Sequence, residues 1–164
     1  MMDLRELYQE IILDHGRHPR NLRAIAEPTH KAQGHNPLCG DRVTIYLSVE
    51  NGRIADLSFE GRGCAISTAA ASLMTEVLKG KSVKEARALF AAFHRRVTGA
   101  ACEVLLGPEA DEAMPPSLAE AMARLEPLFG VKAYPARIKC ATLSWHALDA
   151  ALKDGAAGRL VKTE

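Results

Sequence analysis

The sequence has no excess of charge of either sign. Its 164 residues include 21 lysines and arginines against 20 aspartates and glutamates, which gives a formal net charge of +1 at pH 7. A protein that binds nucleic acid through the phosphate backbone usually carries a basic excess. The balance therefore argues against nucleic acid and favours a protein or a small molecule as the partner.

The sequence also lacks a long apolar run. No stretch approaches the roughly 18 apolar residues that a membrane-spanning helix requires, and residues 1–6 lack the apolar core of a secretory signal. We therefore expect a cytoplasmic protein without membrane association. Because disulfides rarely persist in a reducing cytosol, the four cysteines indicate metal binding or thiol chemistry.

The clearest local pattern that is present predicts a β-hairpin. Apolar and polar residues alternate over residues 42–50, which is typical of a half-buried strand, and Asn51 and Gly52 suit a two-residue hairpin turn. Residues 53–60 are expected to form the returning strand, which Gly61 and Gly63 should end. A shorter strand is expected near residues 29–35.

Helical patterns surround this hairpin. Apolar residues at helical spacing predict a first helix over residues 3–15, with Leu4, Leu7 and Ile11 packed in the core. Further helices are predicted over residues 65–79, 82–95, 117–130 and 141–153, the second and third of which open with Ser-x-x-Glu capping boxes. The last ten residues should be frayed. These elements predict an α+β fold, a small antiparallel β-sheet with helices packed on one face, in a single domain over residues 1–164.

Three of the four cysteines fall at predicted boundaries between elements. Cys39 and Asp41 precede the first clear strand, Cys64 separates the second strand from a helix, and Cys140 opens the last helix. A thiol near a helix N-terminus is favoured as a thiolate, which is both a metal ligand and a nucleophile. The spacing matches no zinc-finger pattern, and a buried core cysteine is the competing interpretation. For Cys102, in an unpatterned stretch, we keep the core interpretation.

The segments around these cysteines resemble a known family. Residues 36–42 read Asn-Pro-Leu-Cys-Gly-Asp-Arg, residues 60–67 read Glu-Gly-Arg-Gly-Cys-Ala-Ile-Ser, and residues 137–143 read Arg-Ile-Lys-Cys-Ala-Thr-Leu. Together with the opening residues 7–21 and the closing residues 145–148, they resemble the U-type iron–sulfur cluster assembly proteins, IscU and SufU. The resemblance implies that family's ligand set, which here is Cys39, Asp41, Cys64 and Cys140.

Three departures from IscU point to the SufU branch. Lys139 stands where IscU proteins typically carry a histidine, residues 134–138 lack the Leu-Pro-Pro-Val-Lys segment that a chaperone grips, and 75 residues separate Cys64 from Cys140. The long separation resembles the insertion of SufU proteins, which here would be a helical segment over about residues 81–133.

Resemblance to SufU implies a zinc-dependent, sulfurtransferase-like protein. It would accept persulfide sulfur from a SufS-type cysteine desulfurase, a pyridoxal-phosphate enzyme, and serve downstream iron–sulfur assembly proteins. The resemblance suggests Cys39 as the acceptor, released when a partner histidine replaces it on zinc. Whether such a protein counts as an enzyme or as a non-enzymatic acceptor stays open.

The charge of the implied site requires compensation. Three thiolates and one carboxylate around a divalent zinc ion leave the bare site at about −2. Among the neighbouring cations, Arg137 is expected to contact the ligands from outside the metal's own coordination and orient them. Arg42, Arg62 and Lys139 are expected to be solvated surface charges.

Two other interpretations keep the same four ligands. A scaffold would hold a transient [2Fe–2S] cluster, or iron, and pass it on because the Asp41 carboxylate is a poor ligand for soft iron–sulfur chemistry. A structural zinc site is the third interpretation, although such sites usually use cysteine and histidine. Outside the ligands, His35 is expected to be an exposed loop residue, Trp145 a core residue and His146 a surface residue.

Overall fold

A four-stranded sheet forms the base of the structure, a computed structural model that describes residues 3–98, 116–154 and 159–162. Strands β1 (His30–Asn36), β2 (Asp41–Glu50) and β3 (Arg53–Arg62) form an antiparallel meander. β4 (Arg159–Lys162) pairs parallel with β1, which gives the order β3-β2-β1-β4. The antiparallel hairpin is confirmed. The expectation of a frayed end is wrong for β4, whose backbone pairs with the edge that β1 would otherwise expose.

The β2–β3 hairpin turns at the predicted residues. Asn51 and Gly52 have φ values of 54° and 76°, the left-handed conformation that such a turn requires at both positions. Gly61 does not end β3 as expected, because it pairs with Val43 and the ladder continues to Arg62. A Cβ on Gly61 would collide with the carbonyl oxygen of Arg42. This glycine therefore allows two strands to approach closely.

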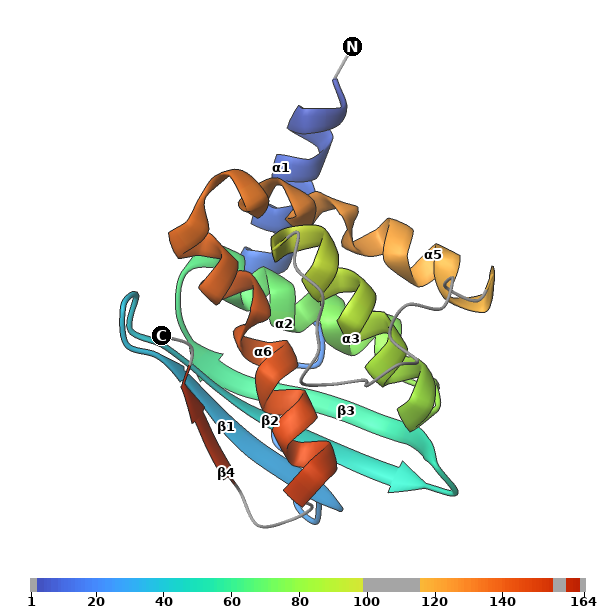
Figure 1. Cartoon of the computed structure of the whole chain (residues 1–164). Helices are drawn as coiled ribbons and strands as arrows, with labels where there is room; N and C mark the ends of the chain where they lie inside the picture. Colours follow the sequence, from blue (N-terminus) through green and yellow to red (C-terminus); the bar gives the residue numbers. More distant parts are fainter. Residues whose placement is uncertain (1–2, 99–115, 155–158, 163–164) are drawn as a thin grey trace.

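Helices cover one face of the sheet (Figure 1). Helices α2 (Ala65–Leu78) and α6 (Pro135–Asp154) contact the strands, and α1 (Leu4–Arg17), α3 (Val83–Thr98) and α5 (Pro116–Leu125) pack against these two helices or one another. The predicted α+β class with helices on one face is thus confirmed. Among the described helices, none is long and apolar enough to cross a membrane.

The boundaries of two helices differ most from the prediction. The helix expected over residues 117–130 is α5, which begins one residue earlier, followed by a 3-10 helix η2 (Glu126–Ala133), because Pro127 lacks the backbone N–H that a continuing α-helix needs. Helix α6 begins at Pro135 rather than 141, since proline suits the first helical position. Cys140 therefore lies inside α6, and the argument from a helix N-terminus does not apply to it.

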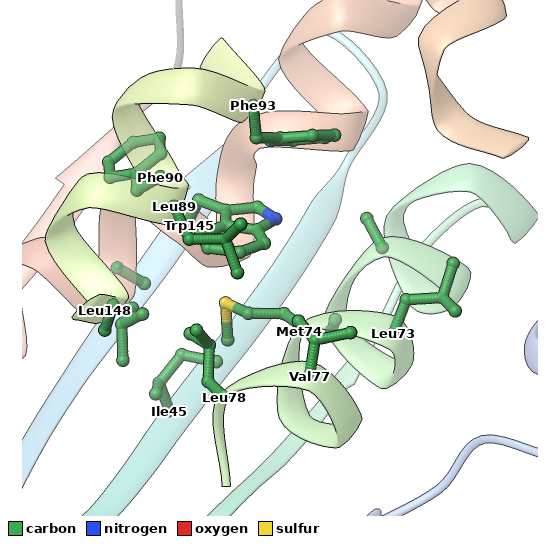
Figure 2. Close-up of a cluster of buried hydrophobic side chains, with 14 of the residues drawn as sticks. Ile45, Leu73, Met74, Val77, Leu78, Leu89, Phe90, Phe93, Trp145 and Leu148 are labelled. Atoms are coloured by element: carbon green, nitrogen blue, oxygen red, sulfur yellow. The ribbon is translucent and has the colours of Figure 1, made fainter. Parts of the chain in front are cut away.

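The core is centred on the aromatic residues between α3 and α6. Trp145 is fully buried, as predicted, and stacks on Phe90 and Phe93 with ring centroids 5.6 and 5.2 Å apart. Figure 2 shows Met74 of α2 on the side of Trp145 opposite Phe93. His146 was expected on the surface but packs edge-on against Phe90 of α3. It directly follows Trp145 on α6 and therefore still faces α3.

The first helix is less buried than expected. Leu4 and Leu7 are 62% and 44% exposed, so the prediction that they lie in the core is wrong. The N-terminal end of α1 projects beyond the rest of the molecule (Figure 1), whereas its C-terminal half contacts α2 and is partly buried. There His15 is buried and its Nδ1 lies 2.7 Å from Ser72 Oγ of α2.

Candidate metal centre

Strand alternation points two polar residues into the interior at one end of the sheet. On β2, Asp41 shares the helix-covered face with Val43, and on β1, Asn36 shares it with Gly34. Asn36 and Asp41 are direct partners in the antiparallel ladder, and both are fully buried. At this end of the sheet, the inward-facing residues of β1 and β2 are therefore the Asn36 amide and, beside it, the Asp41 carboxylate.

Cys64 reaches this pair from the N-cap of α2. Its Sγ accepts a hydrogen bond from the Ser67 N–H at 3.4 Å, the contact by which an N-cap side chain serves a helix. Its backbone N–H donates to Asp41 Oδ1 at 2.8 Å, and its Sγ lies 4.0 Å from Asp41 Oδ2. The predicted position of Cys64 at the start of a helix is confirmed, and the cap holds the thiol next to the carboxylate.

Helix α6 brings Cys140 to the same place because it lies close to β1. A Cβ on Gly34 would stand 2.9 Å from Leu143 Cδ1, so the glycine leaves room for the helix. One turn earlier, Cys140 Sγ lies 3.5 Å from Cys39 Sγ. Cys39 itself is on the turn between β1 and β2, which the Gly40 N–H closes by donating to the Asn36 carbonyl at 2.8 Å.

These contacts form a candidate metal centre. Ligand atoms of Cys39, Asp41 and Cys140 all lie within 4.8 Å of one another. Cys64 lies outside this tightest group but adjoins it through Asp41. Tetrahedral zinc with bonds of about 2.3 Å to sulfur separates two thiolates by about 3.8 Å, close to the spacing between Cys39 and Cys140. The donor set therefore fits a single thiophilic cation.

The three thiols have different surroundings. Cys39 is exposed, Cys64 is half-buried and Cys140 is buried, and all three are free of disulfides. Burial, and then a hydrogen bond with Asp41, raises the pKa of the Cys140 thiol. Because burial opposes the charged form, Cys140 needs a neighbouring cation to become a thiolate.

Arg137 supplies positive charge beside the thiols. Its pKa is raised by a hydrogen bond with Cys140 and by the charges of the cysteines at positions 64, 140 and 39. The guanidinium is exposed, so it lies at the mouth of the site. Arg42 and Arg62 are exposed partners across β2 and β3, which agrees with their assignment as surface charges, whereas Lys139 is half-buried.

Sequence reasoning missed Asn36 and misplaced His35. Asn36 Nδ2 donates to Asp41 Oδ2 at 3.3 Å and to Cys140 Sγ at 3.5 Å. The inward alternation of Ala32, Gly34 and Asn36 carries this information, but only once the strand is extended to residue 36. His35 was expected in an exposed loop; it is half-buried on β1 opposite Arg42, on the other face from the site.

Comparison with known proteins gives a consistent result. The family model described as "NifU-like N terminal domain" matches residues 7–141. The chain is 36% identical over 147 residues to the zinc-dependent sulfurtransferase SufU of Bacillus subtilis (strain 168), covering 90% of each protein. It is 37% identical over 153 residues to the iron–sulfur cluster assembly scaffold protein IscU of Streptococcus pyogenes serotype M1, covering 93% of this chain and 87% of the relative.

A solved structure shares the fold. The iron–sulfur cluster assembly scaffold protein for the SUF system from Fervidobacterium islandicum AW-1 is 31% identical and superposes with a TM-score of 0.71. The match covers 92% of this chain and 99% of the solved chain. The similarity therefore extends over nearly the whole length of both molecules.

Proposed function

Because the chain belongs to the NifU-like N-terminal domain family of iron–sulfur cluster assembly proteins, we propose that it is a zinc-dependent acceptor of persulfide sulfur. The proposed donor is a SufS-type cysteine desulfurase, and the proposed consumers are downstream iron–sulfur assembly proteins. The observation that carries the proposal is the meeting of an exposed thiol, Cys39, with a buried thiol and a buried carboxylate.

The proposed ligands are Cys39, Asp41, Cys64 and Cys140. When bound, zinc would supply charge that keeps the thiols deprotonated, with no redox chemistry of its own. The chain's own groups arrange the ligands: the Cys64 N–H orients Asp41, the Ser67 N–H orients Cys64, and Arg137 offsets negative charge at the mouth.

Cys39 is the proposed sulfur acceptor. Its thiolate attacks the terminal sulfur of the donor's persulfide; a new sulfur–sulfur bond forms on Cys39, the donor's sulfur–sulfur bond breaks, and the donor cysteine leaves as a thiolate. No electron donor is needed, because one persulfide replaces another. Exposure of Cys39 supports this role, since the attacking sulfur must reach a partner's cysteine.

Hydrogen bonding also favours Cys39 over the other two thiols. Cys64 accepts an N–H bond from Ser67 and Cys140 accepts one from Asn36. Within the described part of the chain, no N–H group donates to Cys39 Sγ, whose contact is with Cys140 Sγ. A thiolate without such donors keeps more of its charge available for attack.

The competing function is a scaffold that assembles and passes on a transient [2Fe–2S] cluster. The IscU relative, which is named a scaffold and covers most of this chain, favours it. The ligand atoms of Cys39, Asp41 and Cys140 all lie within 4.8 Å of one another, and this compact grouping of three ligands favours one ion instead. We further propose that residues 1–164 act as one domain with an insertion over about 81–133, and that the protein works in the cytoplasm, where thiols stay reduced.

A desulfurase assay with metal analysis tests the proposal. Protein purified in air should contain about one zinc ion per chain and no visible chromophore. Wild-type protein should stimulate cysteine turnover by the desulfurase and acquire a persulfide on Cys39, detectable by mass spectrometry. Cys39→Ala should lower the stimulation by at least about tenfold while remaining folded. Cys102→Ala is the matched control, because it removes the one cysteine outside the proposed ligand set; Cys102, predicted to be a core residue, lies outside the described residues.

The scaffold function predicts the opposite pattern. Protein reconstituted with iron and sulfide would carry a chromophore that transfers intact to an acceptor protein, and Cys39→Ala would leave desulfurase turnover unchanged. That pair of results would overturn the proposed sulfur transfer.

A further inference from the structure

Asn36 connects the candidate ligands to one another. The residue is fully buried, and its two amide hydrogens are directed to Asp41 Oδ2 at 3.3 Å and Cys140 Sγ at 3.5 Å. Its Oδ1 accepts a hydrogen bond from the Leu38 N–H at 3.2 Å. One side chain thus contacts two ligands and the backbone immediately before a third, Cys39.

We infer that Asn36 is a positioning residue that retains Asp41 and Cys140 in the metal centre and makes Cys39 the thiol that is released. The inference rests on the proposed function, because it concerns how the proposed ligands behave. Both N–H donors of the amide are used on groups that are negatively charged when they bind a cation, and hydrogen bonds to charged groups are among the stronger ones in proteins. Burial strengthens them further by excluding water.

Unlike Asp41 and Cys140, Cys39 receives no hydrogen bond from the Asn36 side chain. Asn36 Oδ1 accepts a hydrogen bond from the Leu38 N–H, and the Asn36 backbone carbonyl accepts one from the Gly40 N–H. These two bonds fix the turn on either side of Cys39. Cys39 lies between these anchors and is exposed, and Asn36 gives its sulfur no donor. The anchored turn lets the Cys39 side chain move outward without carrying Asp41 with it.

Two variants of Asn36 separate its donor role from its role in the turn. Asn36→Asp keeps the shape and the Oδ1 acceptor for Leu38 but replaces the two donors with an oxygen that faces a carboxylate and a thiolate. Asn36→Ala removes the two donors and the Oδ1 acceptor without burying a charge, and it keeps the backbone bond to Gly40. Gln33→Glu is the matched control, since it makes the same amide-to-acid change at an exposed position of the same strand.

Zinc affinity and thiol accessibility are the readouts, and neither involves the desulfurase. Competition with a chromophoric chelator should show zinc affinity falling about 10- to 100-fold in both Asn36 variants, with Gln33→Glu unchanged. In zinc-loaded wild-type protein, iodoacetamide should modify Cys39 before Cys64 and Cys140. In Asn36→Asp the modification rate of Cys140 should rise at least about tenfold. Absorption of the cobalt-substituted protein should report the altered thiolate ligation.

The inference is overturned if folded Asn36→Asp and Asn36→Ala both keep wild-type zinc affinity and the wild-type order of modification. Circular dichroism identifies a variant that does not fold, and Asn36→Ala then decides. Modification of zinc-loaded wild-type protein tests selectivity without any variant: equal rates at Cys39 and Cys140 overturn it. If wild-type protein binds no zinc, the proposed function and this inference fail together. If wild-type protein binds zinc and the Asn36 variants keep its zinc affinity and order of modification, only the inference fails.

Discussion

At the scale of single residues, the site depends on a missing side chain as well as on its ligands. Gly63 lies directly before Cys64, and a Cβ at this position would stand 2.5 Å from Asp41 Oδ1 and 3.1 Å from Asp41 Cγ. The contact is too short for real atoms, and the Asp41 carboxylate is held by the Cys64 N–H on the same side. The absence of a side chain at Gly63 therefore leaves space for the Asp41 carboxylate.

Gly63→Ala is expected to weaken metal binding while leaving the fold intact. The new methyl group must displace the Asp41 carboxylate, so zinc affinity should fall about tenfold or more. Chelator competition measures the affinity, and circular dichroism checks the fold. Gly130→Ala is the control, since a Cβ there meets nothing within 4 Å. Unchanged affinity in Gly63→Ala would show that Asp41 does not ligate the metal.

The three thiols also show how surroundings assign different roles to one residue type. Cys140 is buried, and burial raises the pKa of its thiol, whereas Cys39 is exposed. A buried thiol that depends on a cation suits a ligand that stays in place. An exposed thiol that accepts no N–H hydrogen bond from the described residues suits a ligand that reacts.

At the scale of elements, the packing of α3 on α6 creates a pH-sensitive contact. His94 of α3 and His146 of α6 face each other with ring centroids 5.7 Å apart. Burial, and then the charge of His94, lowers the pKa of His146 to about 4, while Asp149 opposes the shift. Burial also lowers the pKa of His94. Both side chains are therefore neutral in the folded protein at pH 7.

Acidification should destabilise the fold through this contact. The unfolded chain protonates a histidine near pH 6.5, whereas folded His146 does so only near pH 4, so the unfolded state binds more protons between these values. The contribution of His146 to the free energy of unfolding is complete above about pH 6.5. It falls by up to about 3 kcal/mol as the pH drops toward 4.

Urea unfolding followed by Trp145 fluorescence at several pH values measures this effect. His146→Gln should flatten the fall in stability between pH 6.5 and 4, because the side chain no longer titrates. His18→Gln, which removes a histidine at an exposed position, is the matched control. If His146→Gln keeps the wild-type dependence of stability on pH, the lowered pKa of His146 is contradicted.

At the scale of the whole molecule, the candidate metal centre joins separate parts of the chain. Its residues come from the β1–β2 turn, the first residue of β2, the N-cap of α2 and the second turn of α6. A cation bound here would connect the sheet to both helices that contact it. A ligand that binds only the folded state raises stability by mass action.

Zinc should therefore raise the melting temperature. At about 100 times the dissociation constant, binding adds about 2.7 kcal/mol, which corresponds to roughly 5–11 °C for a chain of this size. Thermal unfolding with zinc, with a chelator, and with magnesium as the control measures the shift. Magnesium should have no effect, because it prefers oxygen ligands to thiolates. Equal melting curves with zinc and with chelator would contradict a metal centre that bridges these elements.

The sequence predicted the elements whose signals are local. The hairpin turn at Asn51 and Gly52 and the capping box at Ser82 need only their neighbours, and both form as expected, with Ser82 and Glu85 exchanging two hydrogen bonds of 3.0 Å. The last helix was predicted to begin at residue 141 but begins at Pro135, because proline suits the first helical position. Burial of α1 was overestimated because periodicity does not reveal how far a helix extends beyond its partner.

The sequence by itself determined which residues can bind a thiophilic cation, since cysteine and aspartate carry that chemistry wherever they stand. It also predicted Cys64 at the start of a helix, because the glycine-flanked turn is a local signal. Only the tertiary structure decided that Asn36 donates to Asp41 and Cys140 and that Gly63 makes room for the carboxylate. It also decided that Cys39 is the exposed one of the three cysteines that the structure describes. These properties depend on the strand register, which pairs Asn36 with Asp41, and on the approach of α6 to β1, which brings together residues 104 positions apart.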